Sequence, residues 1–153
     1  MIFATVGTHH QPFERLVRAA IVLAAGRELV VQHGHTPRLP SGRSVRWERW
    51  IAPDDMATLM SEASLVVTHA GVATLVDAVR AGQRPLVMAR RRHLGEHVDD
   101  HQLQIVETLA ALGLIIPAGE DGGAPAAAPV RGERAAWPPP GLKAAVRRAA
   151  LGA

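Results

Sequence analysis

Short apolar runs alternate along this chain with longer stretches in which apolar residues recur every three or four positions. The first run, residues 2–6, ends at Gly7 and has the length and composition of a buried strand. From Phe13 the apolar residues follow helical spacing as far as Gly26, and Pro12 suits the first position of that helix. The same pattern predicts further strands over residues 28–32, 45–51, 65–67, 85–89 and 114–116.

Three more helices are predicted between these strands: one capped by Asp54, one over residues 72–82 and one over residues 99–112. Strands that alternate with helices of this length indicate an α/β fold, in which a Rossmann-like, doubly wound and mostly parallel sheet spans residues 1–116. An alanine-, proline- and glycine-rich tether is expected over residues 117–141, and a short basic helix over residues 142–153.

The composition limits the classes of protein that this sequence can encode. With 153 residues, 48% of them apolar, the chain can bury one core, so a reaction that needs two lobes must take the second from another chain. The chain has no cysteine, which excludes disulfides, thiolate metal sites and cysteine nucleophiles. The longest apolar run, around residues 19–25, is far too short for a membrane span, and no signal peptide is evident. We therefore expect a cytoplasmic protein.

The net charge is +3, and arginine supplies almost all of the cations because Lys143 is the only lysine. This balance fits a phosphate-rich ligand, an anionic membrane surface or nucleic acid. Aromatic residues make up only 3% of the chain, which leaves little material for stacking on bases and disfavours nucleic acid. A biased genomic base composition is the alternative explanation of the arginine content.

In doubly wound sheets, ligands bind beyond the carboxyl ends of the strands. Three segments are expected there: residues 7–11, 68–74 and 90–102. The start of a helix offers free backbone N–H groups, so Gly71 and Thr74 are placed to receive a phosphate without a metal. Arg90, Arg91 and Arg92 follow another strand and favour an anionic ligand further. A tight turn is the alternative explanation of the glycine.

Two phosphate-binding fingerprints are missing from the sequence. No Gly-x-Gly-x-x-Gly follows the first strand and no Gly-Lys-Ser/Thr occurs, which disfavours dehydrogenases and nucleoside triphosphatases. His93, Glu96 and His97 spell the inverted zinc-protease motif, but Gly95 interrupts the helix that this motif needs. We therefore expect no metal site.

Two histidines, His9 and His10, lie beside the first strand-to-helix turn. Either imidazole could act as a general base, because imidazole titrates near neutral pH, and an ordinary polar loop residue is the alternative. His33 and His35 flank a glycine at a strand end and fit loop residues better than ligands.

Three segments carry a resemblance to a known family: TVGTHHQPFERLV at residues 5–17, VVQHGHT at 30–36 and THAGVATLVDAVRAGQRPLVMARRRHLGEHVDDHQLQ at 68–104. They resemble the carboxyl-terminal, donor-binding half of family 28 glycosyltransferases, over about residues 1–116. The stand-alone form is the most similar. It includes the catalytic subunit of the two-part dolichol-linked N-acetylglucosaminyltransferase and the small subunits of bacterial exopolysaccharide glycosyltransferases. The resemblance implies one half of a GT-B fold with a site for a nucleotide-diphosphate sugar, usually a uridine nucleotide.

Carried over position by position, the resemblance assigns roles to individual residues. The residues that would bind the nucleotide and its diphosphate are Gly7, Thr8, His69, Ala70, Gly71 and Thr74, with Asp77 for the ribose. The residues that would face the donor sugar are Glu96, Asp100, His101 and Gln102. His9 is the candidate catalytic base, and His10 stands where the family has an acidic residue. In two-part enzymes the base can come from the partner instead.

The resemblance implies the catalytic, donor-binding subunit of an inverting UDP-sugar glycosyltransferase that needs no metal and no cofactor. Its acceptor would be a lipid-linked saccharide or a polysaccharide. A membrane-anchored, Rossmann-like partner subunit would carry the acceptor site and recruit the chain to the inner face of the membrane. No nucleic acid partner is expected. The alternatives are a non-catalytic nucleotide-sugar-binding or regulatory subunit and, less well supported, a nucleotide-sugar epimerase, which normally has both lobes in one chain.

Overall fold

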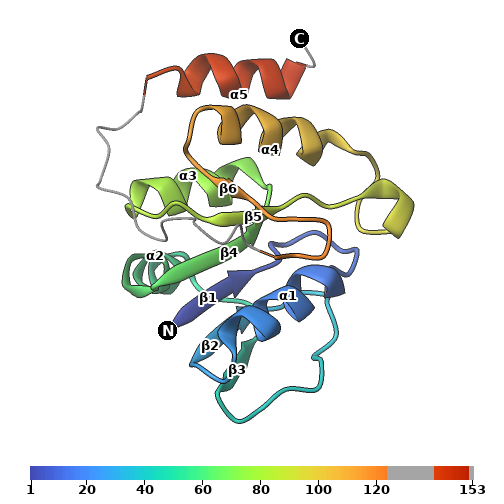
Figure 1. The fold of residues 1–153 in the computed structure, drawn as a ribbon, viewed down its shortest axis with the longest axis vertical. Helices are drawn as coiled ribbons and strands as arrows, with labels where there is room; N and C mark the ends of the chain where they lie inside the picture. Colours follow the sequence, from blue (N-terminus) through green and yellow to red (C-terminus); the bar gives the residue numbers. More distant parts are fainter. Residues whose placement is uncertain (124–139, 152–153) are drawn as a thin grey trace.

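The computed structural model describes residues 1–123 and 140–151. In this part of the chain six parallel strands form one sheet in the order β3-β2-β1-β4-β5-β6 (Figure 1). The strands are β1 (Ile2–Thr5), β2 (Leu29–Gln32), β3 (Val45–Glu48), β4 (Leu65–His69), β5 (Leu86–Met88) and β6 (Ile116–Pro117). The helices are α1 (Glu14–Ala24), α2 (Pro53–Glu62), α3 (Val72–Arg80), α4 (His101–Ala111) and α5 (Leu142–Leu151), with a 3₁₀ helix, η1 (Arg92–Leu94).

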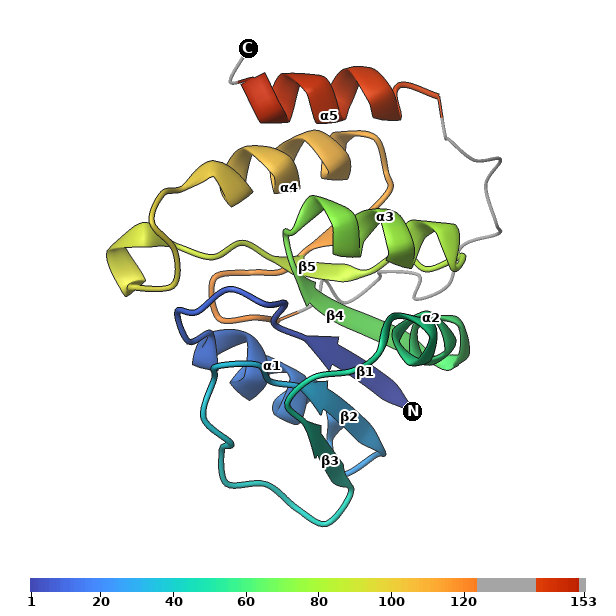
Figure 2. The ribbon, with the colours of Figure 1, turned by 180° about the vertical axis from the view of Figure 1, so that it is seen from behind.

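The central strand β1 shows how the sheet divides the core. Ile2 and Ala4 pack in one apolar cluster with the buried face of α1, whereas Phe3 packs in another with α2 and α3. Successive side chains of a strand point to opposite faces of the sheet, so helices cover both faces. α1 lies on one face, and α2, α3 and α4 lie on the other (Figure 2). This arrangement confirms the predicted α/β, doubly wound fold.

The strand order reverses between β1 and β4, which pair in register from Ile2 and Leu65 to Thr5 and Thr68. The chain leaves β1 toward α1 on one face and leaves β4 toward α3 on the other. The two connections therefore diverge, and a crevice opens at the carboxyl edge of the sheet.

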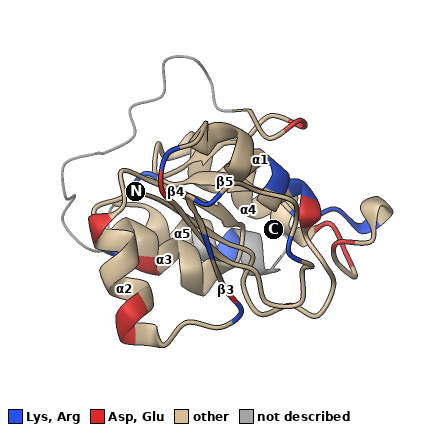
Figure 3. Ribbon diagram, turned by 90° about the horizontal axis from the view of Figure 1, so that it is seen from below, with Lys and Arg blue, Asp and Glu red and all other residues tan. Residues whose placement is uncertain are grey.

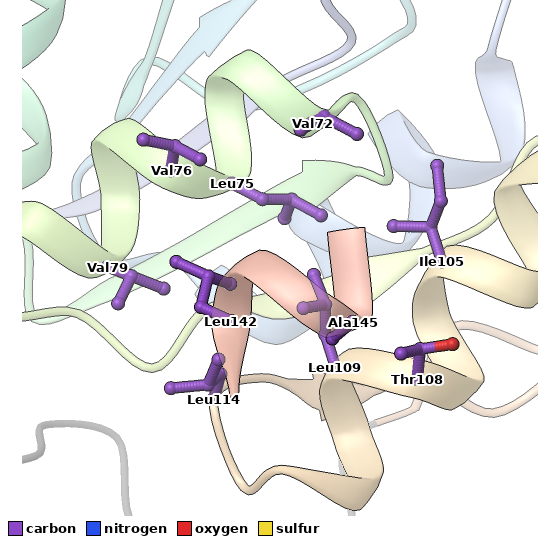
Figure 4. A pocket seen from close by; sticks show the side chains of 10 residues that line it. All are labelled: Val72, Leu75, Val76, Val79, Ile105, Thr108, Leu109, Leu114, Leu142 and Ala145. Atoms are coloured by element: carbon purple, nitrogen blue, oxygen red, sulfur yellow. The ribbon is translucent and has the colours of Figure 1, made fainter. Parts of the chain in front are cut away.

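α5 packs against α4 at one end of the molecule (Figure 1). Its buried Leu142 and Ala145 close a cavity whose other lining residues come from α3, α4 and the segment before β6 (Figure 4). All of the lining residues except Thr108 are apolar, so this cavity offers little to orient a charged ligand. Much of the predicted tether lies outside the described residues, as do residues 152 and 153 of the predicted terminal helix. Among the described residues, no helix has the length and apolar character needed to cross a bilayer.

Three local predictions are wrong. α1 begins at Glu14 rather than at Pro12, because the backbone N–H of Phe13 just before it donates to Thr36 Oγ1 at 2.9 Å. Asp54 does not cap α2, whose N-cap is Ala52 and whose first residue is a proline, which is preorganised for that position. The strand predicted over residues 45–51 ends at Glu48.

Candidate functional site

A cavity of about 360 Å³ opens at the carboxyl edge of the sheet, where β1, β2 and β4 end and α3 begins. Its volume lies within the roughly 300–1,000 Å³ usual for small-molecule sites. The residues that line it are Thr5, Gly7, Thr8, Gln32, Trp50, Ile51, Met56, His69, Gly71, Val72, Ala73 and Thr74. None of these is a lysine, arginine, aspartate or glutamate. Figure 3, in which the ribbon is coloured by residue type, shows acidic residues on α2 and basic residues on α1.

The imidazole of His69 lies close against two glycines, Gly7 and Gly71, at this edge. A Cβ atom on Gly7 would lie 2.5 Å from Cε1 and Nε2 of the ring, and a Cβ atom on Gly71 would overlap Nε2. Gly7 also has a φ of +76°, which itself favours glycine. Gly71 has an ordinary φ of −73°, so the neighbouring ring, and not a turn, requires a glycine there.

His69 is uncharged at neutral pH. Burial lowers its pKa to about 4, and the nearby positive charge of Arg90 acts in the same direction. Nδ1 lies 3.3 Å from the hydroxyl oxygen of Thr68. A neutral imidazole can donate one N–H to a phosphate oxygen but brings no positive charge to the cavity.

The first turn of α3 borders the cavity through Val72, Ala73 and Thr74. The N-cap residue, Gly71, has no side chain to cap the helix, and the first helical hydrogen bond runs from Leu75 N to Gly71 O at 3.0 Å. The N–H groups of the preceding turn therefore have no acceptor within the helix. These donors and the positive end of the helix dipole have the chemistry to receive an anion at the cavity, and anion binding there stays a prediction.

Gln32 and Trp50 line the cavity, and the sequence analysis assigned neither of them a role. Gln32 Nε2 donates to the carbonyl oxygens of Gly7 at 3.3 Å and Arg49 at 3.0 Å, and its Oε1 accepts from Thr5 Oγ1 at 2.6 Å. This amide holds the segment after β1 against the segment after β3. Trp50 is 48% exposed and meets the ring of His35 edge-on, so its indole is held at the cavity with much of its surface open.

Asp77, the predicted ribose ligand, does not line this cavity. Its exposed side chain borders a neighbouring hollow of about 420 Å³ between α2 and α3. Met56 lines both spaces, so the two hollows adjoin. The role of Asp77 in binding ribose stays a prediction.

His9, the predicted base, lies beside the cavity rather than in it. Its ring stacks on His10 with 4.6 Å between centroids and on His97 with 4.5 Å. Burial lowers the pKa of His9, as do, in decreasing order, the charges on His97, Arg90 and His10. His9 is therefore unprotonated at neutral pH, with Nδ1 accepting from the N–H of Gln11 at 3.2 Å.

Glu96 was expected to face the donor sugar, and both of its carboxylate oxygens have partners in the protein. Oε1 accepts from Arg15 Nε at 3.0 Å and Oε2 from Arg15 Nη2 at 2.9 Å. Oε2 also accepts from the N–H of Arg91. The pair ties α1 to the loop after β5, and the carboxylate is buried.

Arg90 does not fit the anion-binding role that we inferred from its place after a strand. Its side chain is fully buried and donates to three backbone carbonyl oxygens instead of facing the cavity. Arg91 pairs loosely with Glu120 at 3.8 Å, and Arg92 is exposed. The cationic appearance of this segment in the sequence therefore does not translate into a cationic cavity.

The other predicted sugar-binding residues lie at the start of α4. Gln102 Oε1 accepts from the N–H of Ala70 at 3.3 Å and from that of Arg90 at 3.0 Å, which ties the ends of β4 and β5 together. Asp100 is the N-cap of α4 and accepts from the N–H of Arg92 at 2.9 Å. His101 is half-buried. The structure brings these residues to the same edge as the cavity, and their contact with a sugar stays a prediction.

The His93–His97 segment does not form the continuous helix that an inverted zinc-protease motif uses. η1 ends at Leu94, its C-cap Gly95 has a φ of +70°, and His97 Nδ1 lies 3.2 Å from Asp99 Oδ1. Across the described residues, no group of three or more histidine, aspartate or glutamate side chains is arranged to hold a metal ion.

Comparison with known proteins identifies the family to which the sequence of this chain is similar. The model of the glycosyltransferase family 28 C-terminal domain matches residues 1–115. A curated relative, the UDP-N-acetylglucosamine transferase subunit ALG13 of Yarrowia lipolytica, is 41% identical over 56 residues, or 37% of this chain. The match spans only 26% of that relative.

Two solved structures share the fold. The glycosyltransferase SnogD from Streptomyces nogalater matches 99% of this chain with a TM-score of 0.52 and 22% identity, over 36% of its own length. The glycotransferase of kitacinnamycin matches 97% of this chain with a TM-score of 0.57 and 18% identity, over 34% of its length. The chain therefore has the fold of one half of a GT-B glycosyltransferase, as predicted.

Proposed function

The chain belongs to the glycosyltransferase family 28 C-terminal domain family, and on that premise we propose that it is the donor-binding catalytic subunit of an inverting UDP-sugar glycosyltransferase. The observation that carries the proposal is the cavity where Gly71, His69 and the start of α3 meet. Its donors suit a diphosphate, because a phosphate can approach the backbone closely at a glycine and accept from several N–H groups at once. When the sugar is transferred, negative charge grows on the departing UDP, and these fixed donors stabilise it.

The rest of the cavity suits the nucleoside. Trp50 presents a flat, half-exposed indole at the end of the cavity away from α4, and an aromatic face of this kind binds a base by stacking. Asp77 lies beyond Met56 and accepts hydrogen bonds from the ribose hydroxyls in our proposal. The sugar then extends past Gly71 toward Glu96, Asp100, His101 and Gln102. No metal is needed in this arrangement, since helix N–H groups take its place.

His9 is our candidate for the base that deprotonates the acceptor hydroxyl. Its lowered pKa keeps it unprotonated at neutral pH, as a base requires. The acceptor itself, a lipid-linked saccharide or a polysaccharide, needs a second lobe in our proposal, because the chain spans only about a third of the two solved glycosyltransferases compared above. The printed name of the Yarrowia relative describes a subunit, which supports a separate partner. In our proposal that partner is membrane-associated and recruits the chain to the cytoplasmic face.

One observation favours a second candidate, a donor-binding subunit without catalytic residues. His9 stacks between His10 and His97 instead of lining the cavity, and Glu96 already pairs with Arg15. If these contacts persist when donor is bound, the base comes from the partner.

Calorimetry on the full chain tests the donor site directly. We expect UDP to bind and Thr74→Val to weaken that binding, because Thr74 lines the cavity, while Thr58→Val on α2 leaves it unchanged. Failure of the wild-type chain to bind UDP, or equal effects of the two variants, would contradict the proposed donor site.

Co-expression with a candidate membrane partner tests the division of labour. The chain alone is expected to release no UDP from a panel of UDP-sugars and to stay out of the membrane fraction. With the partner it is expected to reach that fraction and turn over. Turnover by the chain alone on a lipid-linked acceptor would refute the two-subunit proposal. Unchanged turnover in His9→Gln would favour the second candidate.

A further inference from the structure

Arg90 lies just beyond β5, and its guanidinium sits in the middle of the carboxyl edge of the sheet. Nη2 donates to the carbonyl oxygen of Val6 at 2.8 Å, and Nη1 donates to those of Gln11 at 2.7 Å and Glu96 at 2.9 Å. The guanidinium carbon lies 4.7 Å from the centroid of the Phe13 ring. The side chain has no exposed surface.

Two of these carbonyl groups mark the ends of one short segment. Val6 and Gln11 enclose Gly7, Thr8, His9 and His10, so a single guanidinium fastens both ends of the segment that borders the cavity. The third bond attaches the same group to Glu96, whose carboxylate is held by Arg15. The rigid, planar guanidinium presents several N–H donors at fixed angles, which suits three carbonyl oxygens in different directions.

Burying the charged guanidinium of Arg90 costs desolvation free energy that an apolar side chain would not. Desolvation lowers the pKa of Arg90 to about 10, partly offset by the charge of Glu96, so the group stays charged at neutral pH. Its Nε has no hydrogen-bond partner among the described residues. An apolar side chain of similar volume is often as good for stability, which points to a role beyond packing.

We propose that Arg90 is a positioning residue, which clamps the segment from Val6 to Gln11 so that Gly7 borders the donor cavity and His9 stands beside it. The link from this clamp to catalysis rests on the proposed transferase function, whereas the clamp itself does not. Arg90 acts through the segment and never contacts the donor.

The charge of Arg90 offers a second, separate readout. His9 faces Arg90, His10, His97 and Asp99, of which only Asp99 raises its pKa. Removing the guanidinium charge therefore raises the pKa of His9. Arg90→Lys keeps a charge but can reach only part of the set of carbonyl oxygens, whereas Arg90→Met removes both the charge and the clamp. The two variants thus separate position from electrostatics.

Nuclear magnetic resonance on the full chain tests this inference without any partner. In both variants we expect hydrogen exchange of the amides from Gly7 to Gln11 to accelerate at least about tenfold relative to the amides of β4. We also expect the affinity for UDP to fall about tenfold, since Gly7 and Thr8 line the cavity. The His9 imidazole should titrate at higher pH in Arg90→Met than in Arg90→Lys. Arg92→Met, exposed and two residues away, is the matched control and should behave as wild type.

The outcomes separate this inference from the proposed function. If the amides from Gly7 to Gln11 exchange hydrogen at the wild-type rate in folded Arg90→Lys, the proposed clamp is overturned, whatever the protein binds. If Arg90→Met does not fold, Arg90→Lys alone decides, by its exchange and its affinity for UDP. Uniform acceleration across β4 as well would show a merely structural role. A wild-type chain with a rigid segment but no affinity for UDP would overturn the proposed function and leave the clamp intact.

Discussion

Substituting Gly71 by alanine is the sharpest perturbation that the candidate site offers. Alanine adopts the φ of −73° and ψ of 124° found there without strain, so the backbone contributes nothing to the effect. The added Cβ would overlap Nε2 of His69 and lie 2.9 Å from its Cδ2. Gly7 also lies against this ring, which limits the space into which the ring can shift. The imidazole must therefore leave its place or the start of α3 must move.

The magnitude follows from two separate terms. Overpacking a buried site of this kind costs typically ~1–3 kcal/mol of folding free energy. Losing one hydrogen bond to a charged ligand costs ~1.5–3 kcal/mol of binding free energy. Since each 1.4 kcal/mol is a factor of about ten, we expect the affinity of Gly71→Ala for UDP to fall roughly 10- to 100-fold.

Calorimetric titration with UDP measures the binding free energy, and urea unfolding of the same samples measures the folding free energy. Gly42→Ala is the control, because the nearest atom to its Cβ would be Ser44 Oγ at 3.9 Å. In the His69→Ala background the clash with the ring is gone, so adding Gly71→Ala should weaken UDP binding less than it does in the wild-type background. An affinity for UDP within twofold of wild type in folded Gly71→Ala would refute the reasoning.

Three further predictions concern the same edge of the sheet. Asp77→Asn should weaken UDP binding and leave pyrophosphate binding unchanged, with Glu62→Gln on α2 as control, and calorimetry showing equal losses for both ligands would contradict a ribose contact. The affinity for UDP should be the same in EDTA as with added Mg²⁺ or Zn²⁺, and a strict metal requirement measured in the same way would overturn the metal-free site. Because the pKa of His69 falls from 6.5 in the unfolded chain to about 4 in the fold, neutral His69 stabilises the fold above pH 6.5, and this contribution is lost as the pH falls toward 4. Urea unfolding should show a steeper loss of stability over that range in the wild type than in His69→Ala, by up to ~3 kcal/mol, and parallel curves would show that His69 is not buried neutral.

The fold was predictable because its signals are local. Runs of three to five apolar residues mark buried parallel strands, and each run ends near a glycine or proline that the structure also uses. The strand predicted over residues 45–51 is too long because Trp50 and Ile51 continue the apolar pattern, although they lie beyond the end of β3 and line the cavity. Asp54 resembles an N-cap in the sequence, but α2 begins one residue earlier, at a proline, so Asp54 falls within the first turn.

The site was less predictable, because its contacts join residues far apart in the chain. The sequence singles out Gly71 because it follows a strand and precedes a helix. The ring of His69 is what requires a glycine there, and the orientation of that ring cannot be inferred from residue spacing. Arg90 meets Val6 across 84 positions and Gln32 meets Gly7 across 25. Arginine after a strand is typical of an anion site, and only the positions of the three carbonyl oxygens show that this one is a clamp.

These contacts explain how an edge with so many arginines can hold an uncharged cavity. Arg15 is neutralised by Glu96, and Arg90 is enclosed by carbonyl oxygens and the Phe13 ring. These two arginines thus hold the loops in place, and the cavity is left with backbone N–H groups, threonine hydroxyls and a neutral imidazole as donors. Such donors need no reorganisation when charge develops on a leaving diphosphate. Under the proposed function, donors without net charge bind UDP less tightly than a buried cluster of arginines would, and so favour its release after transfer.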